Sequence, residues 1–319
     1  MKKLFSLVLA AALVLCVFSG CGAQQSNGEM KKIGILQFAQ HPSLDEISAA
    51  VQKQLEEQAA LKGIDLTISL QNAQGDMSTI QSICQQFVSQ KFDLIIAIAT
   101  PAAQGAAAAI EGTEIPLVFS AVTDPVAAEL VASMNAPGGN ITGTSDAIAP
   151  EKIFALAKEL TPDVKTFGFI YNTSEVNSVS VVKEAKTYLE KEGIATVENA
   201  VTTSGEVQLA AQNLLSRCDA VFVPIDNTVA NAMSVLADEA IKAGKPVYTA
   251  ADSLVKDGGL ATVGVNYTNL GIKTADMALR VLQGEKPAGM PVEILQDSVV
   301  VVNPDTAAAL GIDVSQYTA

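Results

Sequence analysis

Residues 93–104, DLIIAIATPAAQ, decide the fold. The segment begins with an almost unbroken apolar run, which is typical of a strand covered by helices on both faces. Thr100 and Pro101 then suit a helix start, because threonine caps helix ends and proline fits the first helical position. A buried strand that leads directly into a helix is the repeating unit of a parallel α/β sheet.

The same unit recurs on both sides of this segment. Ser43 and Glu46 have the spacing of a capping box, which predicts a helix with Ser43 as its cap. Short connections through helices imply right-handed crossovers and therefore a parallel sheet. The other strands predicted for this sheet lie at 32–38, 64–70, 115–119 and 141–144.

The pattern restarts after residue 150 and predicts a second sheet. A helix at 151–160 comes first, and strands follow at 167–171, 196–201, 220–224 and 246–249. The remaining tail offers too few strands to fold alone, so it must extend the sheets already built. We therefore expect an α/β protein of two Rossmann-like lobes, with a hinge formed by several chain crossings.

The amino terminus has the layout of a secretory signal peptide over residues 1–20. Two lysines precede an apolar run that is too short for a membrane span of ~20 residues. Phe18-Ser19-Gly20-Cys21 resembles the lipobox of bacterial lipoproteins, although leucine is usual where Phe18 stands. This resemblance implies lipidation of Cys21, and the polar residues 21–30 then suit a flexible, lipid-anchored linker.

Charge and cysteine usage narrow the class of protein further. The full chain carries a net charge of −14, and loss of the two signal-peptide lysines leaves 18 basic residues against 34 acidic ones, or −16. Because a chain with this net negative charge repels nucleic acid and anionic lipid, we expect no nucleic-acid partner. Cys84 and Cys218 lie in separate apolar segments, and we predict buried free thiols.

Sequence signatures of catalysis are missing. The chain has no G-x-S-x-G, Walker A, C-x-x-C or strand-following G-x-G-x-x-G motif. It has one histidine, His41, and its acidic residues do not cluster at metal-ligand spacing. We therefore expect a protein that is not an enzyme and that uses no metal or cofactor. His41 follows the first strand and is either a loop residue or a ligand contact.

Polar residues at strand ends are the candidate binding site, because ligands of open α/β sheets bind beyond the carboxyl ends of the strands. Single residues of these types are common in turns, so their joint placement in both lobes carries the argument. The candidates are Thr100, Ser120, Ala121, Thr123, Asp124, Ser145, Asp146, Asn172, Ser174, Glu175, Asp226 and Asn227.

An amino acid suits such a cleft because groups of the cleft can pair with both its carboxylate and its ammonium. Hydroxyls and amides at Thr100 and 120–123 could bind its carboxylate, and the helix start at Thr100 favours an anion. Asp146 or Asp226 could pair with its ammonium through charge-assisted hydrogen bonds. The side chain would be left to apolar contacts, for which we predict Phe38, Phe119 or Tyr248.

Seven motifs occur in a characteristic order along the chain. They are IGILQFAQHPSLDEI (33–47), DLIIAIATPAAQ (93–104), PLVFSAVTDPVAA (116–128), GGNITGTSDAI (138–148), FGFIYNTSEVNS (167–178), VFVPIDNTV (221–229) and GVNYTNLGIKTADMA (264–278). In these motifs the chain resembles one family, the substrate-binding lipoproteins of ABC importers that are similar to tryptophan and tyrosine binders. FSAVTDPV and NITGTSD together are fairly specific for it.

The resemblance implies the type I periplasmic binding protein fold, with two parallel sheets joined by a three-strand hinge. We place the crossings near residues 162, 264 and 290. The expected lobes are then 31–162 with 265–290, and 163–264 with 291–319. The implied function is capture of a small solute, often an aromatic amino acid, by an extracytoplasmic protein that is attached to the cell membrane and delivers the solute to an ABC permease. We expect this protein to be a monomer.

Other functions of the same fold stay open at this point. A sugar-binding protein fits the fold, although aromatics make up only 5% of the chain and arginines are few. A receptor-linked sensor would use the same lobe closure as its signal. A transcription regulator would need a basic helix-turn-helix in place of the leader. A secreted enzyme would need a nucleophile beside a base, and the sequence shows none.

Overall fold

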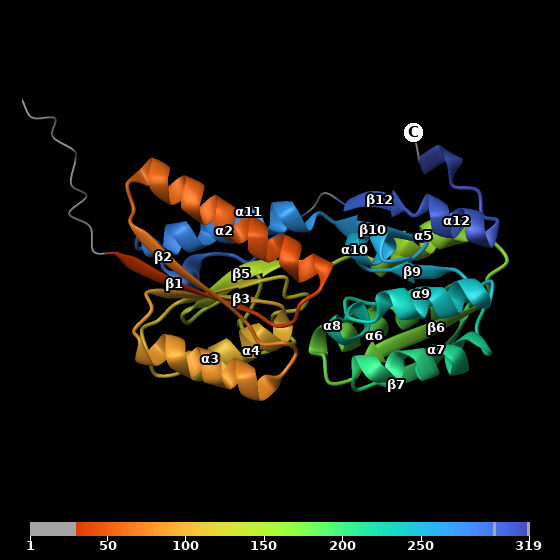
Figure 1. The fold of residues 1–319 in the computed structure, drawn as a ribbon, viewed down its shortest axis with the longest axis horizontal. Helices are drawn as coiled ribbons and strands as arrows, with labels where there is room; N and C mark the ends of the chain where they lie inside the picture. Colours follow the sequence, from red (N-terminus) through yellow and green to blue (C-terminus); the bar gives the residue numbers. More distant parts are fainter. Residues whose placement is uncertain (1–29, 296–297, 318–319) are drawn as a thin grey trace, which may run out of the picture.

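The computed structural model describes residues 30–295 and 298–317 of the 319-residue chain. It forms two lobes, each a six-stranded sheet between layers of helices, which lie side by side in Figure 1. The predicted signal peptide, Cys21 and most of the linker lie outside the described residues. Among the described residues, no helix is long and apolar enough to span a bilayer.

Lobe 1 is built on a fully parallel sheet of order β11-β5-β4-β3-β1-β2. Helices α2 and α11 cover one face, and α3 and α4 cover the other (Figure 1). The elements are β1 Lys31–Gln37, α2 Pro42–Lys62, β2 Leu66–Asn72, α3 Met77–Ser89, β3 Leu94–Ile98, α4 Thr100–Ile110, β4 Leu117–Ser120, β5 Ile141–Ser145, α11 Tyr267–Leu282, η2 Pro287–Gly289 and β11 Glu293–Ile294.

Lobe 2 has the sheet order β12-β10-β9-β8-β6-β7, in which β12 alone runs antiparallel to its neighbour. Helices α5 and α6 pack together, as do α7 and α9. The elements are α5 Pro150–Leu160, β6 Thr166–Asn172, α6 Val176–Lys191, β7 Ala195–Val201, η1 Ser204–Glu206, α7 Val207–Leu215, β8 Ala220–Val223, α8 Asn227–Ala230, α9 Met233–Lys242, β9 Val247–Thr249, α10 Asp252–Lys256, β10 Ala261–Val265, β12 Ser298–Val302, α12 Pro304–Leu310 and η3 Ser315–Tyr317.

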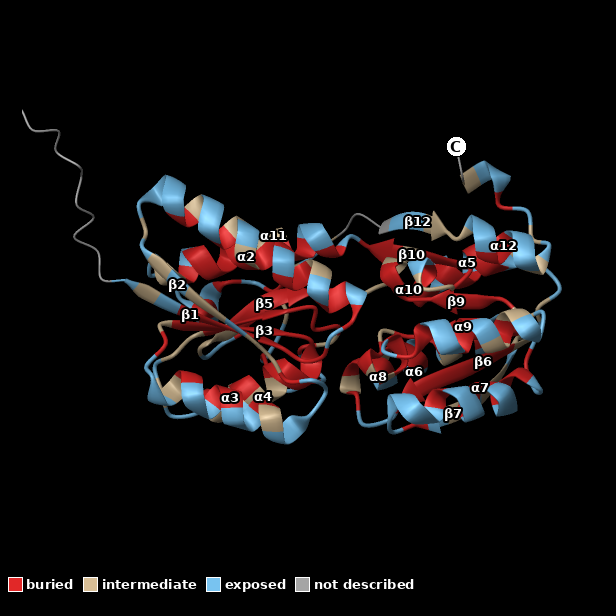
Figure 2. Cartoon of the chain, in the orientation of Figure 1, coloured by how far each residue is buried: buried red, intermediate tan, exposed pale blue. Residues whose placement is uncertain are grey.

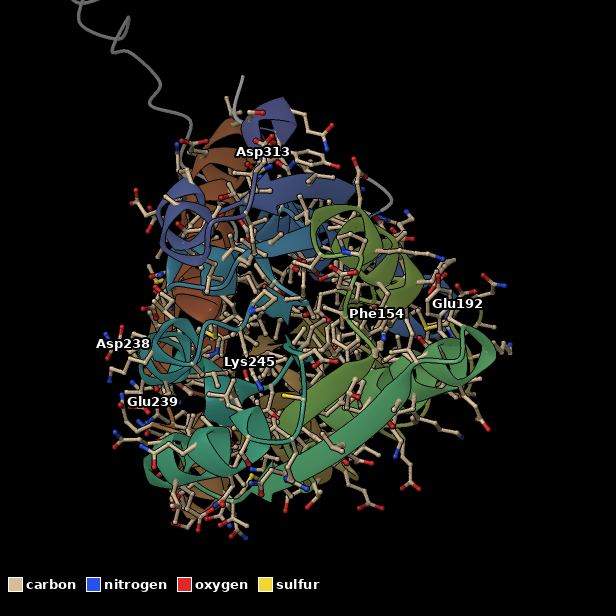
Figure 3. All side chains as sticks on the ribbon, turned by 90° about the vertical axis from the view of Figure 1, so that its right-hand side faces the viewer. Phe154, Glu192, Asp238, Glu239, Lys245 and Asp313 are labelled. Atoms are coloured by element: carbon tan, nitrogen blue, oxygen red, sulfur yellow. The ribbon has the colours of Figure 1, made fainter. Side chains whose placement is uncertain are left out.

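Burial follows the hydrophobic pattern of the sequence. Every residue of β3 is buried, as the apolar run predicted, and the central strands form the buried interior of both lobes in Figure 2. Seen from the lobe 2 end in Figure 3, Glu192, Asp238 and Asp313 lie on the exposed surface. Phe154, by contrast, packs its ring against Phe167 and Phe222 in the core. Two-faced burial therefore confirms the covered parallel sheets.

Two of the three chain crossings lie elsewhere than we predicted. Helix α5 packs in the core of lobe 2, so the first crossing falls between Ser145 and Pro150 and not near 162. Strand β11 pairs with β5 in lobe 1, so the third crossing falls after Ile294 and not near 290. The second, between β10 and α11, lies close to the predicted 264. An amphipathic helix shows that one face is buried, but not against which sheet.

The start of α2 also differs from the prediction. The helix begins at Pro42, and its N-cap is His41, without a side-chain cap. Ser43 therefore makes no capping box; its hydroxyl is hydrogen-bonded to the hydroxyl of Ser253 on lobe 2. Glu46 accepts hydrogen bonds from the amide and hydroxyl of Thr268 at the start of α11. Proline at the first helical position sets the helix start two residues earlier than predicted.

Close packing of α11 on α2 fixes the second crossing. A side chain at Gly271 would place its Cβ 2.7 Å from the carbonyl oxygen of Ile47 and 2.8 Å from Cβ of Ala50, so only glycine allows this approach. Asn266 caps α11 by accepting a hydrogen bond from the amide of Asn269. Tyr267, the first residue of α11, is thereby held where the chain passes between the lobes.

Candidate ligand-binding site

A small cavity lies between the lobes at the carboxyl ends of their strands. Its volume is ≈ 20 Å³, which holds about one water molecule. The lobes are therefore closed on each other, and a larger solute must enter when they move apart. The cavity is lined by His41, Ser43, Leu44, Ala99, Thr100, Ala121, Asp146, Asn177, Ile225, Asp226, Asn227, Ala230, Ala251, Leu254 and Tyr267.

Two turns on the lobe 1 side hold strained backbone. Ala99 after β3 has φ +82°, and Ala121 after β4 has φ +54°, a region that non-glycine residues rarely adopt. Such strain persists only where the surroundings impose it, and it gathers at binding sites. Both residues line the cavity, so the strain lies in the wall that a solute would touch.

Thr100 is the first of two open polar groups on lobe 1. The prediction that it caps α4 is wrong, because Ala99 occupies the N-cap and Thr100 is the first helical residue. Its side chain is 2% exposed, and its hydroxyl has no hydrogen-bond partner among the described residues. Amides in the first turn of a helix also lack partners within the helix. Together they offer donors to an anion at this point of the cavity.

Asp146 is the second open group. Its side chain is 1% exposed and accepts hydrogen bonds from the hydroxyls of Thr123 (2.8 Å) and Tyr267 (3.3 Å). None of the ion pairs among the described residues includes it. Burial, without a neighbouring cation, raises the pKa of this carboxyl to about 6. A cationic group of a ligand would supply the missing charge.

Tyr267 is a site residue that the sequence interpretation missed. It lies 3% exposed at the second crossing, and its hydroxyl donates to Asp146. Burial and the Asp146 carboxylate raise its pKa well above the ordinary value, so the phenol stays protonated and remains a donor. Its position two residues after the end of β10 was the signal that could have identified it, since the other candidates were chosen at strand ends.

Glu175 on lobe 2 is buried, and both of its carboxylate oxygens are occupied. One oxygen accepts from the amide of Asn227 (3.0 Å), the side-chain amide of Asn227 (2.6 Å) and that of Asn177 (3.1 Å). The other accepts from the amide (3.0 Å) and hydroxyl (2.9 Å) of Thr228. This carboxylate therefore holds the start of α8 and has little capacity left for a ligand.

Asp226 is similarly occupied. It caps α8 through the amide of Val229 (2.8 Å) and also accepts from the amide of Asn172 (2.7 Å) and the hydroxyl of Ser178 (2.7 Å). Burial and the neighbouring Glu175 raise its pKa, while these donors lower it. Although Asp226 lines the cavity, its hydrogen-bonding capacity is used to join β6, α6 and α8.

Two further polar atoms of the cavity wall have no hydrogen-bond partner in the part of the chain that the structure describes. His41 is 6% exposed and approaches Oδ1 of Asn227 through Nε2 at 3.1 Å, across the two lobes. Its other ring nitrogen, Nδ1, is buried without a partner among the described residues, and so is Oδ1 of Asn177. Both residues line the cavity. Buried polar atoms are almost always satisfied, so these mark where a ligand donor would bind.

The other predicted residues lie behind the cavity or outside it. Ser120 bonds to Thr274, Ser145 to the carbonyl of Thr123, and Asn172 to Thr228. Asp124 reaches across the lobes to Ser180 (3.2 Å), and Ser174 is exposed to solvent. The aromatic contacts that we predicted do not line the cavity, because their rings lie in the lobe cores; these residues are Phe38, Phe119 and Tyr248.

The cavity wall offers side chains suited to polar recognition of a ligand. No group of three or more histidine, cysteine, aspartate or glutamate side chains within residues 30–295 and 298–317 could hold an ion. Cys84 and Cys218 are buried free thiols away from the cavity. The cleft instead combines one carboxylate without a cation, two open acceptors and a hydroxyl beside a helix start.

Comparison with known proteins places the chain in a family. The model of the ABC transporter substrate binding protein family matches residues 32–318. The chain belongs to this family. Its members are extracytoplasmic binding proteins, which agrees with the strand-end cleft between two lobes. The predictions of the family, the two-lobed type I fold and the substrate-binding function are thus confirmed.

Relatives of this substrate-binding protein support the same assignment. It is 40% identical to a tyrosine-binding protein of Clostridioides difficile, over 97% of this chain and 92% of that one. It is 39% identical to a Streptococcus pneumonia protein solved in complex with L-Trp, with a TM-score of 0.86 over 90% of this chain and 97% of that one.

A third relative shows the state of the lobes. The ligand-free, open structure of a substrate binding protein with adhesive properties from Clostridium difficile is 42% identical, with 90% and 97% of the two chains covered. Its TM-score is only 0.69, despite an identity as high as that of the L-Trp complex. The lobes of this substrate-binding protein are therefore arranged more like those of the L-Trp complex, in keeping with its small cavity.

Proposed function

We propose that this substrate-binding protein captures an aromatic amino acid as a zwitterion between its lobes and delivers it to the permease of an ABC importer. The observation that carries the proposal is Asp146, a carboxylate buried in the cavity wall that has two hydroxyl donors and forms no ion pair with any residue the structure describes. A buried charge is costly unless it is paired. The ammonium of an amino acid completes this pair.

The ammonium can reach acceptors on both lobes. Asp124 follows β4 and bonds to Ser180 of α6, so the first turn of α6 lies opposite the β4 and β5 ends of lobe 1. Asn177 belongs to that turn, and its Oδ1 is an open acceptor. An ammonium has three donors, and Asp146 with Asn177 accepts two or more of them.

The carboxylate of the ligand fits the start of α4. The Thr100 hydroxyl is a buried donor without a partner among the described residues, and the first-turn amides point along the helix axis. The positive end of the helix dipole favours an anion there. Thr100 follows β3 and Asp146 follows β5, which lies two strand positions away. Separate parts of the cavity wall therefore bind the carboxylate and the ammonium of a zwitterion.

Part of the remaining lining is apolar and suits a ring. Tyr267 is the aromatic side chain of the lining, since the chain contains no tryptophan. The names of the two relatives, a tyrosine-binding protein and an L-Trp complex, support an aromatic ligand. The aliphatic contacts are Leu44, Ile225, Ala230, Ala251 and Leu254.

Binding would stabilise the closed arrangement. Thr100 and Asp146 belong to lobe 1 and Asn177 to lobe 2, so a ligand contacts all three only when the lobes meet. A ligand with different affinity for two states shifts the equilibrium between them. Closure then gives a permease one recognisable state of the loaded protein.

A binding screen with cut-down ligands tests this function. The sample is the chain lacking residues 1–23, which retains both lobes, and the readout is melting temperature followed by calorimetry. At ~100 times its Kd a ligand adds about 2.7 kcal/mol, which raises the melting point by several degrees. We expect a rise in melting temperature with tyrosine or tryptophan. We expect none with tyramine, which lacks the carboxylate, or with 4-hydroxyphenylpropionate, which lacks the ammonium. A response to a sugar alone would refute the amino-acid assignment.

We further propose that Cys21 carries the lipid anchor after removal of residues 1–20, and that the protein works as a monomer. The support is the leader sequence and the polar linker that follows it. Covalently attached lipid chains hold a folded domain at a membrane surface, and stable anchoring needs more than one acyl chain. Cys21→Ala should move the protein from the membrane fraction to the soluble fraction, and membrane retention of that variant would contradict lipidation. A dimer in sedimentation would contradict the monomer.

A further inference from the structure

The orientation of the Asn227 side chain is fixed by Glu175. The side-chain amide nitrogen of Asn227 lies 2.6 Å from a Glu175 oxygen, and a carboxylate can only accept hydrogen bonds. The Asn227 side chain must therefore turn its NH₂ to Glu175 and its Oδ1 to His41. The hydrogen-bond network thus assigns the amide without ambiguity.

This orientation fixes the tautomer of His41. Because Oδ1 of Asn227 is an acceptor, Nε2 of His41 at 3.1 Å must donate. Burial lowers the pKa of His41, which keeps the ring neutral. In a neutral ring the other nitrogen is an acceptor, so Nδ1 presents a lone pair. That nitrogen is buried and has no partner among the described residues, and the ring lines the cavity.

The position of His41 in the sheet places it away from the charged end of the ligand. His41 follows β1, Thr100 follows β3 and Asp146 follows β5, in the sheet order β5-β4-β3-β1. Three strand spacings of ~4.8 Å separate β5 from β1, or about 14 Å. A zwitterion held between β5 and β3 therefore extends its side chain toward β1 and His41.

We propose that His41 is a specificity-determining residue, whose Nδ1 accepts a hydrogen bond from a donor on the ligand side chain. The site then selects amino acids with a phenolic O–H or an indole N–H over phenylalanine, which has neither. This inference rests on the proposed function and deepens it. A site built to bond a ligand donor rejects the analogue that lacks it, because its own polar atom is left unpaired.

Two substitutions separate this role from the contact between the lobes. Glutamine in His41→Gln places an amide nitrogen near the original Nε2, so it keeps the donor to Asn227 and removes the acceptor. Asparagine in His41→Asn places an oxygen near the original Nδ1, so it keeps the acceptor and removes the bond across the lobes. Each variant is therefore the control for the other.

The experiment is calorimetric titration of both variants and the wild type, without residues 1–23, with tyrosine and phenylalanine. We expect the wild type to prefer tyrosine at least about tenfold. His41→Gln should reduce that preference to within about threefold by weakening tyrosine. His41→Asn should keep the preference while weakening both ligands together. Tryptophan and its benzothienyl analogue, which lacks the N–H, form a second matched pair.

The outcomes that overturn the inference differ from failure of the proposed function. Equal wild-type affinity for tyrosine and phenylalanine would leave an amino-acid binder and remove the role of His41. Preference kept in His41→Gln but lost in Asn177→Leu would assign the acceptor to Asn177 instead. Wild-type protein that binds no aromatic amino acid would refute both the function and the inference.

Discussion

The two walls of the cleft use the same residue types for different purposes. On lobe 2, Glu175 and Asp226 together accept eight hydrogen bonds, all from the protein. On lobe 1, Asp146 accepts two, both from hydroxyls. An acidic residue at a strand end thus has a structural role when nearby amides donate hydrogen bonds to its carboxylate, and it is free to bind a ligand when they do not.

The cause of this difference is the element that follows each strand. Helix α8 begins directly after Asp226, so its free amides take the carboxylate as a cap. Asp146 instead precedes the first crossing, where α5 starts four residues later, at Pro150. The residues between them form neither helix nor strand, so no helix start lies directly after Asp146. The carboxylate is therefore left to hydroxyls and to the cavity.

Removal of Glu175 should have the largest effect. Glu175→Ala leaves five buried or partly buried donors of Asn177, Asn227 and Thr228 without their acceptor, and we expect a loss of at least about 3 kcal/mol of unfolding free energy. Urea denaturation measures it. Glu175→Gln, which keeps the volume and one acceptor oxygen, should lose less. A fully stable Glu175→Ala protein would contradict the structural role of the lobe 2 acids.

Removal of the Asp146 charge should affect binding and leave folding intact. Asp146→Asn keeps the shape, and we expect a loss of about 1.5–3 kcal/mol of ligand-binding free energy, the range for hydrogen bonds to charged groups. Calorimetry measures the affinity, and thermal melting without ligand should show equal or higher stability. Asp226→Asn is the matched control, with the opposite expectation: lower stability and a smaller change in affinity.

Acidification should separate stability from affinity at Asp146. Its pKa rises from 3.8 in a free carboxyl to about 6 in the fold. A raised pKa means that the native state holds the proton more tightly, so this contribution to stability is full below pH 3.8 and lost as pH rises through about 6. Binding of the ammonium needs the ionised form and should weaken below that pH.

Comparing the wild type with Asp146→Asn isolates the effect of Asp146 ionisation on stability and on ligand affinity. Their stability difference, measured by ligand-free melting, should shrink as pH falls from neutral toward 4, because the protonated acid and the amide are both uncharged. Affinity of the wild type should fall over the same interval, while that of the variant changes little. Parallel pH profiles of the two proteins would show that Asp146 does not titrate in this range.

The smallest expected effect is at the contact between the walls. Ser180→Ala removes the hydrogen bond of 3.2 Å to Asp124 across the lobes, and we expect a loss of about 0.5 kcal/mol in binding free energy. Ser82→Ala, whose hydroxyl bonds within α3, should change nothing. A tenfold loss of affinity in Ser180→Ala would mean that this contact, and not the ligand, dominates closure.

Much of the fold followed from pattern alone, because strand and helix periods and strand-end placement are local properties. The apolar run before Thr100 predicted β3, and every residue of that strand is buried. The assignment of α5 to lobe 1 was wrong, because an apolar helix face shows that the helix is buried but not which sheet it packs against. The division between Asp146 and Asp226 depends on which amides lie near each carboxylate, and only tertiary structure decides that.

The aromatic residues that we predicted as ligand contacts do not line the cavity, for a related reason. Phe119 and Tyr248 lie on strands, where alternate side chains point to opposite faces of the sheet and so into the helix layers. The ring that reaches the cavity, Tyr267, begins a helix at a crossing between the lobes. Residues at crossings contact both lobes, and they are better candidates for a cleft than residues within strands.

The bond between His41 and Asn227 gives the protein a natural spectroscopic reporter. The chain has a single histidine, so an imidazole ¹⁵N spectrum contains the signals of one ring only. When the lobes separate, Asn227 leaves with lobe 2, and His41 gains solvent on both nitrogens and is free to exchange its proton between them. The two nitrogen shifts therefore distinguish a fixed tautomer in the closed form from an averaged one in the open form, without a fluorophore or spin probe attached to the protein.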